Sequence, residues 1–425
     1  MQQTVLLQRL KDGGAEAQLW KTQFGFRSKR STDDALFIVR RRVEQALAAR
    51  GGKAFLLALD WRKAFYSIAP DRLIWALESF GVNAPMLAAI SEIYSDRCFT
   101  VADAGNESTP RPQKAGISQG CPLSPFLFGI VMTVLMTDAQ SMLSPAAQAA
   151  CLKGELEDTL FADDTLIISS SGAHVEEYMA AVESKGKDYG LQVHWGKVHL
   201  ITVGTTTPVK SPTGAEIPPQ DSMLYLGSTI HKNGKFGCEI SRKIGAASAE
   251  FRALQPVWRN ASLPKRRKIE FFRSLILSKL RYGVASAWLS KADLRRLDGF
   301  QARCLRKMLK VPPAFISRIS NERVRRMVDE QPFSKQVRAT QLKLLGQVFM
   351  DPNKKQLRQV AFQADGLTPA TEAFVRKVGR PKHNWVDQLT NIMRKAAGSL
   401  HNWLKITTSM RDWNMVATRA LSNAE

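Results

Sequence analysis

The sequence predicts an α+β protein, with strands and helices mixed in its first half and helices alone in its second. Apolar strand-like runs at residues 54–60 and 159–168 lie between helical stretches. From residue 239 onward, apolar positions recur with a helical period. The 425 residues are enough for two or three domains of ordinary size.

The net charge of the chain indicates a polyanionic partner. Lys and Arg number 61 against 38 Asp and Glu, which gives a formal charge of +23. A field of this sign attracts nucleic acid, which is the partner we favour. A membrane surface is the alternative polyanion, but no long basic amphipathic segment stands out.

The chain carries no signal for secretion, metal knuckles or membrane insertion. Its most apolar stretch, residues 126–136, is far shorter than the ~20 residues of a membrane span. The apolar run at the N-terminus is too short for a signal peptide. No pair of cysteines has the spacing of a zinc knuckle. We therefore expect an intracellular protein, nuclear or cytoplasmic, without membrane contact.

A basic segment precedes the first clear helix, which we expect at residues 34–49. Arg27, Lys29 and Arg30 stand directly before a Ser/Thr/Asp cap. Cations beside a helix N-terminus form an anion site. A solvated basic loop is the alternative.

The strand expected at residues 54–60 ends in Asp60. A carboxylate in this position can hold a metal ion at the edge of a sheet, whereas a helix cap is the alternative. Helices are expected next at residues 71–80 and 84–94, and strand-like segments at 98–102 and 111–115.

Residues 116–125, GISQGCPLSP, form a loop rich in glycine and proline, before a helix that reaches about residue 142. Glycine allows close approach of a ligand to the backbone, and Gln119 can both donate and accept hydrogen bonds. We favour a binding loop over a generic turn.

Residues 159–168, TLFADDTLII, predict a strand hairpin with two adjacent carboxylates at its tip. We place the turn at residues 162–164. Carboxylates side by side repel each other, and Mg²⁺ commonly lies between such groups in enzymes. A solvated turn is the alternative for Asp163 and Asp164 taken alone.

The rest of the chain is expected to contain one more strand region and then helices. A helix at residues 174–189 precedes a strand at 201–203. Residues 224–230 predict a strand that leads to a hairpin turn at Asn233 and Gly234. The later helices are expected at residues 239–254, 265–282, 291–310, 322–330 and 334–348. Their basic faces favour nucleic-acid contact over simple solvation.

The order of these motifs resembles that of the reverse transcriptases of LINE-type non-LTR retrotransposons. The sequence LDWRKAF (residues 59–65) is similar to the first catalytic motif of that family. The loop at residues 116–125 is similar to its template-and-nucleotide loop, and FADD (residues 161–164) to its catalytic Asp-Asp box.

Further segments extend the resemblance over residues 20–390. They are QFGFR in the fingers (23–27), the stretch that ends at Lys197 (190–197), YLG of the primer grip (225–227), two thumb segments (280–288 and 300–306) and GRP with a later Trp (379–385). His194 and Val198 stand where the family usually has Asn and Thr.

The resemblance implies a right-hand polymerase fold within the α+β class. Residues 1–53 would be partial fingers, and residues 54–236 a palm with an antiparallel sheet and helices. Residues 237–320 would form a helical thumb, and residues 321–425 a basic helical C-terminal region.

The resemblance also implies an RNA-directed DNA polymerase that uses an RNA template, a DNA primer and dNTPs. Asp60, Asp163 and Asp164 would be catalytic and would hold Mg²⁺, with Mn²⁺ as an alternative. Arg27, with Lys29 or Arg30, would clamp the triphosphate. The other implied roles are exclusion of a ribose 2′-hydroxyl by Phe65, contact with the nascent base pair by Gln119 and Gly120, proton donation to pyrophosphate by Lys197, and primer grip by Tyr225, Leu226 and Gly227.

Three departures from the family pattern define the alternatives. Tyr66 replaces the Asp that usually follows Phe65, only 22 residues precede the Gln23 motif, and an endonuclease is absent. We therefore expect a truncated element product. An inactive remnant that only binds nucleic acid is the alternative. An RNA-dependent RNA polymerase is a third hypothesis, against which Phe65 argues.

Overall fold

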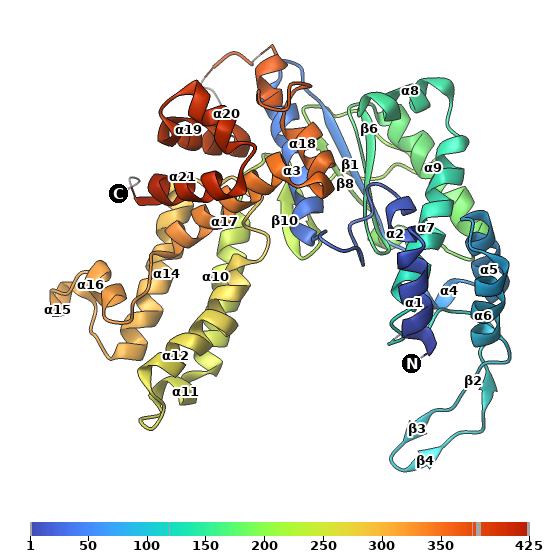
Figure 1. Cartoon of the computed structure of the whole chain (residues 1–425), viewed down its shortest axis with the longest axis horizontal. Coiled ribbons are helices and arrows are strands. Elements are labelled where there is room, and N and C mark those ends of the chain that lie inside the picture. The colour runs from blue at the N-terminus through green and yellow to red at the C-terminus, as the bar shows by residue number, and fades with distance from the viewer. Residues whose placement is uncertain (1, 119, 376, 380–383, 423–425) are drawn as a thin grey trace. The chain divides into compact units, whose positions relative to one another are not determined.

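The computed structural model describes residues 2–118, 120–375, 377–379 and 384–422 (Figure 1). The chain divides into two compact units. The first contains Met1–Ala35 and Lys53–Asp221, and the second contains Leu36–Gly52 and Ser222–Glu425. Helix α3 (Thr32–Ala48) crosses the division after Ala35. Each unit is described below by itself.

The first unit is built on a four-stranded antiparallel sheet with the order β6-β7-β1-β8. Its strands are β1 (Ala54–Leu59), β6 (Leu156–Phe161), β7 (Asp164–Ser169) and β8 (His199–Val203). Strand β1 lies inside the sheet, where Leu57 is opposite Ile167 on β7 and Leu200 on β8. Because five of the six residues of β1 are buried, this strand fixes the position of Asp60, the residue that follows it.

Helix α7 (Ser124–Ser141) forms the centre of the helical layer of this unit. It is apolar on nearly every side, and it contacts both α5 (Pro70–Ser79) and α9 (Gly172–Asp188). The remaining helices are α1 (Gln2–Asp12), α2 (Ala15–Gln18), α4 (Ala64–Ser67), α6 (Ala84–Tyr94), α8 (Pro145–Lys153) and η1 (Trp195–Lys197). Helices α1, α2 and α8 were not predicted from the sequence.

Two short ribbons extend from α6 in Figure 1. Strand β2 (Cys98–Phe99) pairs with β5 (Arg111–Pro112), and β3 (Ala102–Asp103) pairs with β4 (Asn106–Glu107). The predicted strands at residues 98–102 and 111–115 are therefore present, but shorter. All eight strand residues are exposed, so no packed face extends them.

The second unit begins with part of α3 and a small hairpin, followed by helices. The hairpin pairs β9 (Ser222–Tyr225) with β10 (Ser228–His231). The helices are α10 (Gly237–Ala253), α11 (Gln255–Arg259), α12 (Lys265–Phe271), the π-helical η2 (Phe272–Leu277), α13 (Ser278–Arg281) and α14 (Lys291–Leu309). The helix expected at residues 265–282 is thus interrupted by a π-helical segment.

The C-terminal part of the second unit is helical as predicted. Its elements are α15 (Ala314–Ser317), α16 (Asn321–Arg326), α17 (Phe333–Met350), η3 (Pro352–Lys354), α18 (Lys355–Ala361), η4 (Ala370–Ala373), α19 (Trp385–Ala397), α20 (Leu400–Ile406) and α21 (Met410–Ser422). Helix α17 contacts α14, α19 and α21. None of the helices in the described ranges has both the length and the apolar character that crossing a membrane requires.

The predicted strand at residues 224–230 is wrong, because the chain turns in its middle. Leu226 and Gly227 form a two-residue turn with φ of 46° and 68°, and Tyr225 pairs with Ser228 across it. Positive φ at both positions is typical of the tightest hairpins. The turn expected at Asn233 and Gly234 is present, with Gly234 donating to the His231 carbonyl at 2.9 Å, but it leads into α10 at Gly237 and not into a hairpin strand.

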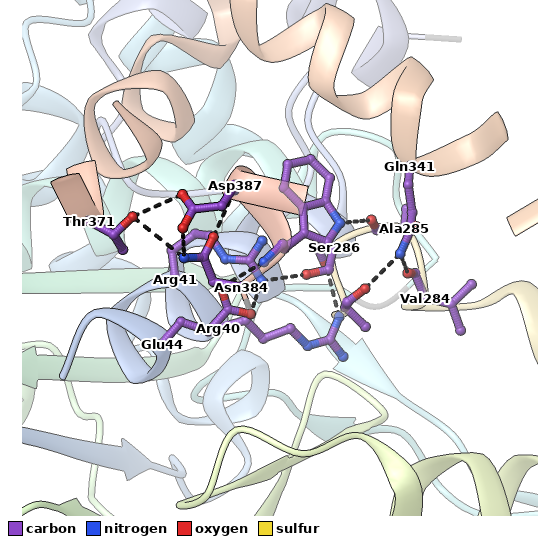
Figure 2. A network of polar contacts seen from close by, with 12 residues as sticks. Arg40, Arg41, Glu44, Val284, Ala285, Ser286, Gln341, Thr371, Asn384 and Asp387 are labelled. Atoms are coloured by element: carbon purple, nitrogen blue, oxygen red, sulfur yellow. Dashed lines mark hydrogen bonds and ion pairs between the residues drawn. The ribbon is translucent and has the colours of Figure 1, made fainter. Parts of the chain in front are cut away.

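A buried polar network fastens α3 to α19 within the second unit (Figure 2). The buried Arg41 guanidinium donates to Glu44 Oε1 at 2.8 Å and to the Ser286 carbonyl at 2.9 Å. Trp385 donates from its backbone to Glu44 Oε2 and from its indole to the Ala285 carbonyl. Burial raises the pKa of Glu44, and the Arg41 charge opposes that shift. The ion pair is therefore stabilised by hydrogen bonds to the backbone around it.

Trp385 should be a main determinant of the stability of the second unit. Its ring lies 5.1 Å from Phe37 and 5.1 Å from the Arg41 guanidinium, and it is buried. We expect Trp385→Ala to lower the free energy of unfolding by about 3–5 kcal/mol, the usual cost of a deleted core aromatic. Trp385→Phe should cost less, because an aromatic ring remains edge to face with Phe37 while the indole hydrogen bond is lost. Urea unfolding of both variants measures this, and equal losses would contradict the assignment.

Candidate active site

Strand register brings three carboxylates to one edge of the sheet. Leu59 pairs with Thr165 in the antiparallel β1–β7 ladder, so Asp60 and Asp164 are the next residues outward. Phe161 pairs with Asp164, which leaves Ala162 and Asp163 as a two-residue turn. The turn is thus one residue shorter than predicted, and Asp164 begins β7.

Gln23 holds this turn by two hydrogen bonds to Ala162, and a third, from Gly25, fixes the Gln23 side chain itself. Its Oε1 accepts from the backbone N–H of Ala162 and of Gly25, each at 2.9 Å, and its Nε2 donates to the Ala162 carbonyl at 3.1 Å. The Gln23 side chain is buried. Ala162 has a φ of 57°, a region that residues with a Cβ rarely adopt. The buried amide therefore holds the tip in a strained conformation.

Gly25 allows the same contact sterically. A Cβ at this position would lie 2.3 Å from the backbone nitrogen of Ala162, which no real side chain could tolerate. The flanking backbone follows β6, because Phe24 donates to the Leu160 carbonyl and Leu160 to the Thr22 carbonyl. The segment at residues 22–25 is therefore a support for the hairpin.

The carboxylates disfavour one another's charged forms. Burial, followed by the charges of Asp163 and Asp60, raises the pKa of Asp164 to about 6. Burial and the Asp60 charge also raise the pKa of Asp163. A cation at this edge would lower both pKa values and relieve the repulsion.

Asp60 already has one cationic neighbour, Lys197. The Lys197 ammonium lies 3.2 Å from Asp60 Oδ2, and its side chain is 62% exposed. Lys197 ends η1, and this segment is held beside β1 because His194 donates to the Asp60 carbonyl at 2.7 Å. An exposed ion pair is weak, so Lys197 can exchange this partner for another anion.

The donor chemistry of the edge suits a hard divalent cation. Carboxylate oxygens are the ligands that Mg²⁺ prefers, and here they come from two strands and a turn. Within the part of the chain that the structure describes, no three His, Cys, Asp or Glu side chains are gathered closely enough to hold a metal ion. Asp60, Asp163 and Asp164 thus interact through their charges without forming a closed cage.

Two of the three predicted triphosphate cations are engaged with the backbone. Arg27 donates to the carbonyls of Trp20 and Glu16, each at 2.9 Å. Arg30 donates to the Lys21 carbonyl, and burial followed by the Arg27 charge lowers its pKa to about 10. Lys29, by contrast, is exposed. The triphosphate clamp stays a prediction.

Phe65 is fixed by its aromatic neighbours. Its ring stacks on Phe128 of α7 with a centroid distance of 4.4 Å and meets the edge of Phe26 at 6.2 Å. The loop after residue 115 is joined to the same region, since Ile117 donates to the Phe65 carbonyl at 2.6 Å. Gly120 is exposed with a φ of 88°. Gln119 lies outside the described residues.

The predicted primer-grip residues belong to the second unit. The Tyr282 hydroxyl donates to the Leu226 carbonyl at 2.7 Å, and Arg242 donates to the Gly227 carbonyl at 2.8 Å. Tyr225 is buried beside them in β9. Both carbonyls of the turn are therefore fixed. Of the predicted C-terminal segment, residues 380–383 lie outside the described residues.

Sequence reasoning missed the role of Gln23. The motif QFGFR marked its segment, but as a phosphate site and not as the support of the carboxylate turn. The Gly25 in that motif was the available signal, because glycine often marks close backbone approach.

The geometry agrees with a comparison against protein families. A model described as reverse transcriptase (RNA-dependent DNA polymerase) matches residues 1–230, more than half of the chain. The chain belongs to the reverse transcriptase family. The predicted family and its α+β right-hand polymerase fold are thereby confirmed. Reverse transcriptases generally use a divalent metal ion.

Curated relatives of this chain come from insect mobile elements. It is 26% identical to a Pol polyprotein of the type-1 retrotransposable element R2 of Popillia japonica, over 60% of this chain and 43% of the relative. It is 24% identical to the RNA-directed DNA polymerase of the mobile element jockey of Drosophila melanogaster, over 69% and 32%. The chain therefore spans less than half the length of either relative.

Solved polymerases also align with this chain. A Candida albicans telomerase, solved with a fragment of telomeric RNA, aligns at 13% identity over 84% of this chain and 55% of its own, with a TM-score of 0.38. The RNA-dependent RNA polymerase of a human picobirnavirus aligns at 12% identity over 71% and 52%, with a TM-score of 0.35.

The raised pKa of Asp164 predicts a pH-dependent cost to stability. Between about pH 4 and 6 the native state binds this proton more tightly than the unfolded state, so stability falls as pH rises through that window. In EDTA, Asp164→Asn should raise the free energy of unfolding by about 1 kcal/mol at pH 8, after discounting for solvent screening, and by about half as much at pH 5. Urea unfolding at both pH values measures this. The exposed Glu155→Gln is the control, and a gain of equal size at pH 5 and 8 would contradict the prediction.

Proposed function

We propose that this chain is an RNA-directed DNA polymerase that copies RNA into DNA by adding deoxynucleotides to a primer. The observation that carries this proposal is the arrangement of Asp60, Asp163 and Asp164 at one sheet edge, with Lys197 beside them. These residues lie within the segment that matches the reverse transcriptase family.

Asp60, Asp163 and Asp164 are the proposed catalytic residues and ligands of Mg²⁺, with Mn²⁺ as an alternative. When bound, such ions polarise the primer 3′-hydroxyl and neutralise charge on the leaving pyrophosphate. The protein's own contribution is to hold these carboxylates in fixed positions. Asp60 follows a buried strand, and Asp163 stands on a turn that Gln23 holds. Fixed carboxylates keep the reacting groups aligned without a reorganisation cost.

Lys197 is the proposed proton donor to the leaving pyrophosphate. Its exposed ammonium, 3.2 Å from Asp60, is close to the carboxylates and free to move with the side chain. A positioned ammonium can supply a proton as negative charge develops on the leaving oxygen.

Phe65 is proposed to select the sugar. Because its ring is stacked on Phe128 and bordered by Phe26, it cannot swing aside without losing both contacts. A fixed ring of this kind excludes a ribose 2′-hydroxyl by steric conflict. The dNTP substrate follows from this role.

The remaining substrate contacts are proposed from the family motifs. Arg27, Lys29 and Arg30 would approach the triphosphate, with the exposed Lys29 as the side chain that can reach it without giving up a backbone contact. Gln119 and Gly120 would contact the template base pair. Tyr225, Leu226 and Gly227 would hold the DNA primer, which the fixed carbonyls of their turn support.

The proposed domains follow the same motifs. Residues 1–53 are assigned to fingers, 54–236 to the palm, 237–320 to the thumb and 321–425 to a basic C-terminal region. The net charge of +23 supports an RNA template and a DNA primer as partners. Copying of this kind would take place inside the cell, in the nucleus or cytoplasm.

Primer extension tests the proposal directly. With an RNA template, a DNA primer, dNTPs and Mg²⁺, the full chain should extend the primer. Asp163→Asn should lower the rate at least about a hundredfold, since it removes a charge worth several kcal/mol in such sites. Glu155→Gln, an exposed carboxylate on the same unit, should extend like the unsubstituted chain.

A second readout separates the metal site from folding. Mg²⁺ should raise the melting temperature of the unsubstituted chain more than that of Asp163→Asn. A chain that binds primer–template but extends nothing would contradict the polymerase proposal and support a nucleic-acid-binding remnant. A preference for rNTPs over dNTPs would contradict the role of Phe65.

A further inference from the structure

The short helix α15 presents two large apolar side chains to solvent. Phe315 is 76% exposed and Ile316 is 62% exposed. Figure 1 shows α15 and α16 beside the C-terminal end of α14, at the outside of the second unit. We call residues 310–326 the α15 tip. Burying these side chains would be favourable, so a partner of suitable shape gains binding energy here.

The α15 tip is held in its conformation by a buried arginine. Arg306 of α14, only 7% exposed, donates to the Pro312 carbonyl at 2.7 Å, to the Asn321 side chain at 3.0 Å and to the Ile319 carbonyl. A guanidinium with several fixed acceptors fixes the backbone on both sides of α15. The backbone on both sides of Phe315 is therefore held by hydrogen bonds, and the Phe315 side chain is exposed on this ordered segment.

The charge around the tip is strongly positive. Between residues 303 and 329 there are eight Lys and Arg and only two acids, Glu322 and Asp329. Glu322 is paired with Arg326. Apart from the buried Arg306 and the half-buried Arg325, the cations are exposed, namely Arg303, Lys307, Lys310, Arg318, Arg323 and Arg326. A polyanion is the occupant that this charge favours.

An exposed aromatic ring among cations is the combination that binds single-stranded nucleic acid. A base stacks on the ring while the cations contact the phosphates on either side. In a duplex the faces of the bases are covered by their neighbours, so the ring would find no partner. A protein partner with an apolar surface could cover the ring, but it would gain nothing from the positive charge around it.

We infer that the α15 tip is a binding site for single-stranded nucleic acid. Phe315 stacks on an unpaired base, and Ile316 extends the apolar platform. Arg318 and Arg323 contact the adjacent phosphates. This inference goes beyond the polymerase proposal, because binding at the tip is measured without any nucleotide addition.

Fluorescence anisotropy with a 20-nucleotide uridine RNA tests the inference. Phe315→Ala and Phe315→Leu should each weaken binding of the single strand about tenfold, since stacking on an aromatic ring is lost in both. Phe315→Trp should bind like the unsubstituted chain. Binding of a blunt RNA duplex should change less than twofold in all three variants. Leu152→Ala, at an exposed apolar position 90% accessible on the first unit, should leave both affinities unchanged.

The salt dependence distinguishes the roles of the residues. Phe315→Ala should keep the slope of log affinity against log salt concentration, whereas Arg318→Ala with Arg323→Ala should lower its magnitude by about 1.4, since each phosphate contact to a single strand contributes about 0.7. Because these side chains are exposed, the melting temperature should not change.

Three outcomes would overturn the inference. They are single-strand affinity unchanged by Phe315→Ala, equal losses for the single strand and the duplex, and retention of full affinity by Phe315→Leu. Self-association that Phe315→Ala abolishes without any change in RNA binding would assign the tip to a second copy of the chain. Failure of primer extension would leave these binding results unaffected.

Discussion

The hydrogen bonds between the Gln23 amide and the backbone of Ala162 are the contact on which the candidate active site depends. Ala162 has a left-handed conformation that costs about 1 kcal/mol or more for a residue with a Cβ. A two-residue turn in water would not keep that conformation reliably. The buried amide offsets the cost with two hydrogen bonds to Ala162, each worth about 1 kcal/mol, and Gly25 leaves the space in which they form. As a result, Asp163 stands on a fixed turn and Asp164 begins a strand in a fixed register.

The site that this contact supports lowers the stability of the fold around it. Three carboxylates at one edge raise the pKa values of Asp163 and Asp164, so at neutral pH the native state carries charges that burial and repulsion disfavour. The Lys197 ammonium relieves only Asp60, and it does so through an exposed pair of small energy. The buried strand β1, which is hydrogen-bonded to β7 and β8 on its two sides, provides stability that compensates for the repulsion among these carboxylates. Such a balance is typical of sites arranged for a charged ligand.

The sequence predicted those features that depend on local pattern, and it failed where distant contacts decide. Asp60 at the end of an apolar strand and the Asp163–Asp164 hairpin were both visible, because strand period and turn residues are local signals. The turn at Leu226 was not visible, because leucine rarely adopts a positive φ. The Leu226 carbonyl accepts a hydrogen bond from the Tyr282 hydroxyl, 56 residues away in the chain, and this contact holds the turn. The use of Gln23 was hidden for the same reason, because its partner Ala162 is 139 residues away. The positions predicted as substrate contacts, Phe65 among them, stay predictions.

Hydrogen–deuterium exchange at the β6–β7 hairpin tests the central claim most directly. The Ala162 amide donates to Gln23 Oε1 in a buried position, so it should exchange slowly in the unsubstituted chain. In Gln23→Ala, a peptide that covers residues 160–165 should exchange at least about tenfold faster, the effect of losing about 1.4 kcal/mol of local stability. Peptides from β8 should be unchanged, and the exposed Gln8→Ala should behave like the unsubstituted chain. An unchanged exchange rate at residues 160–165 in Gln23→Ala would contradict the account.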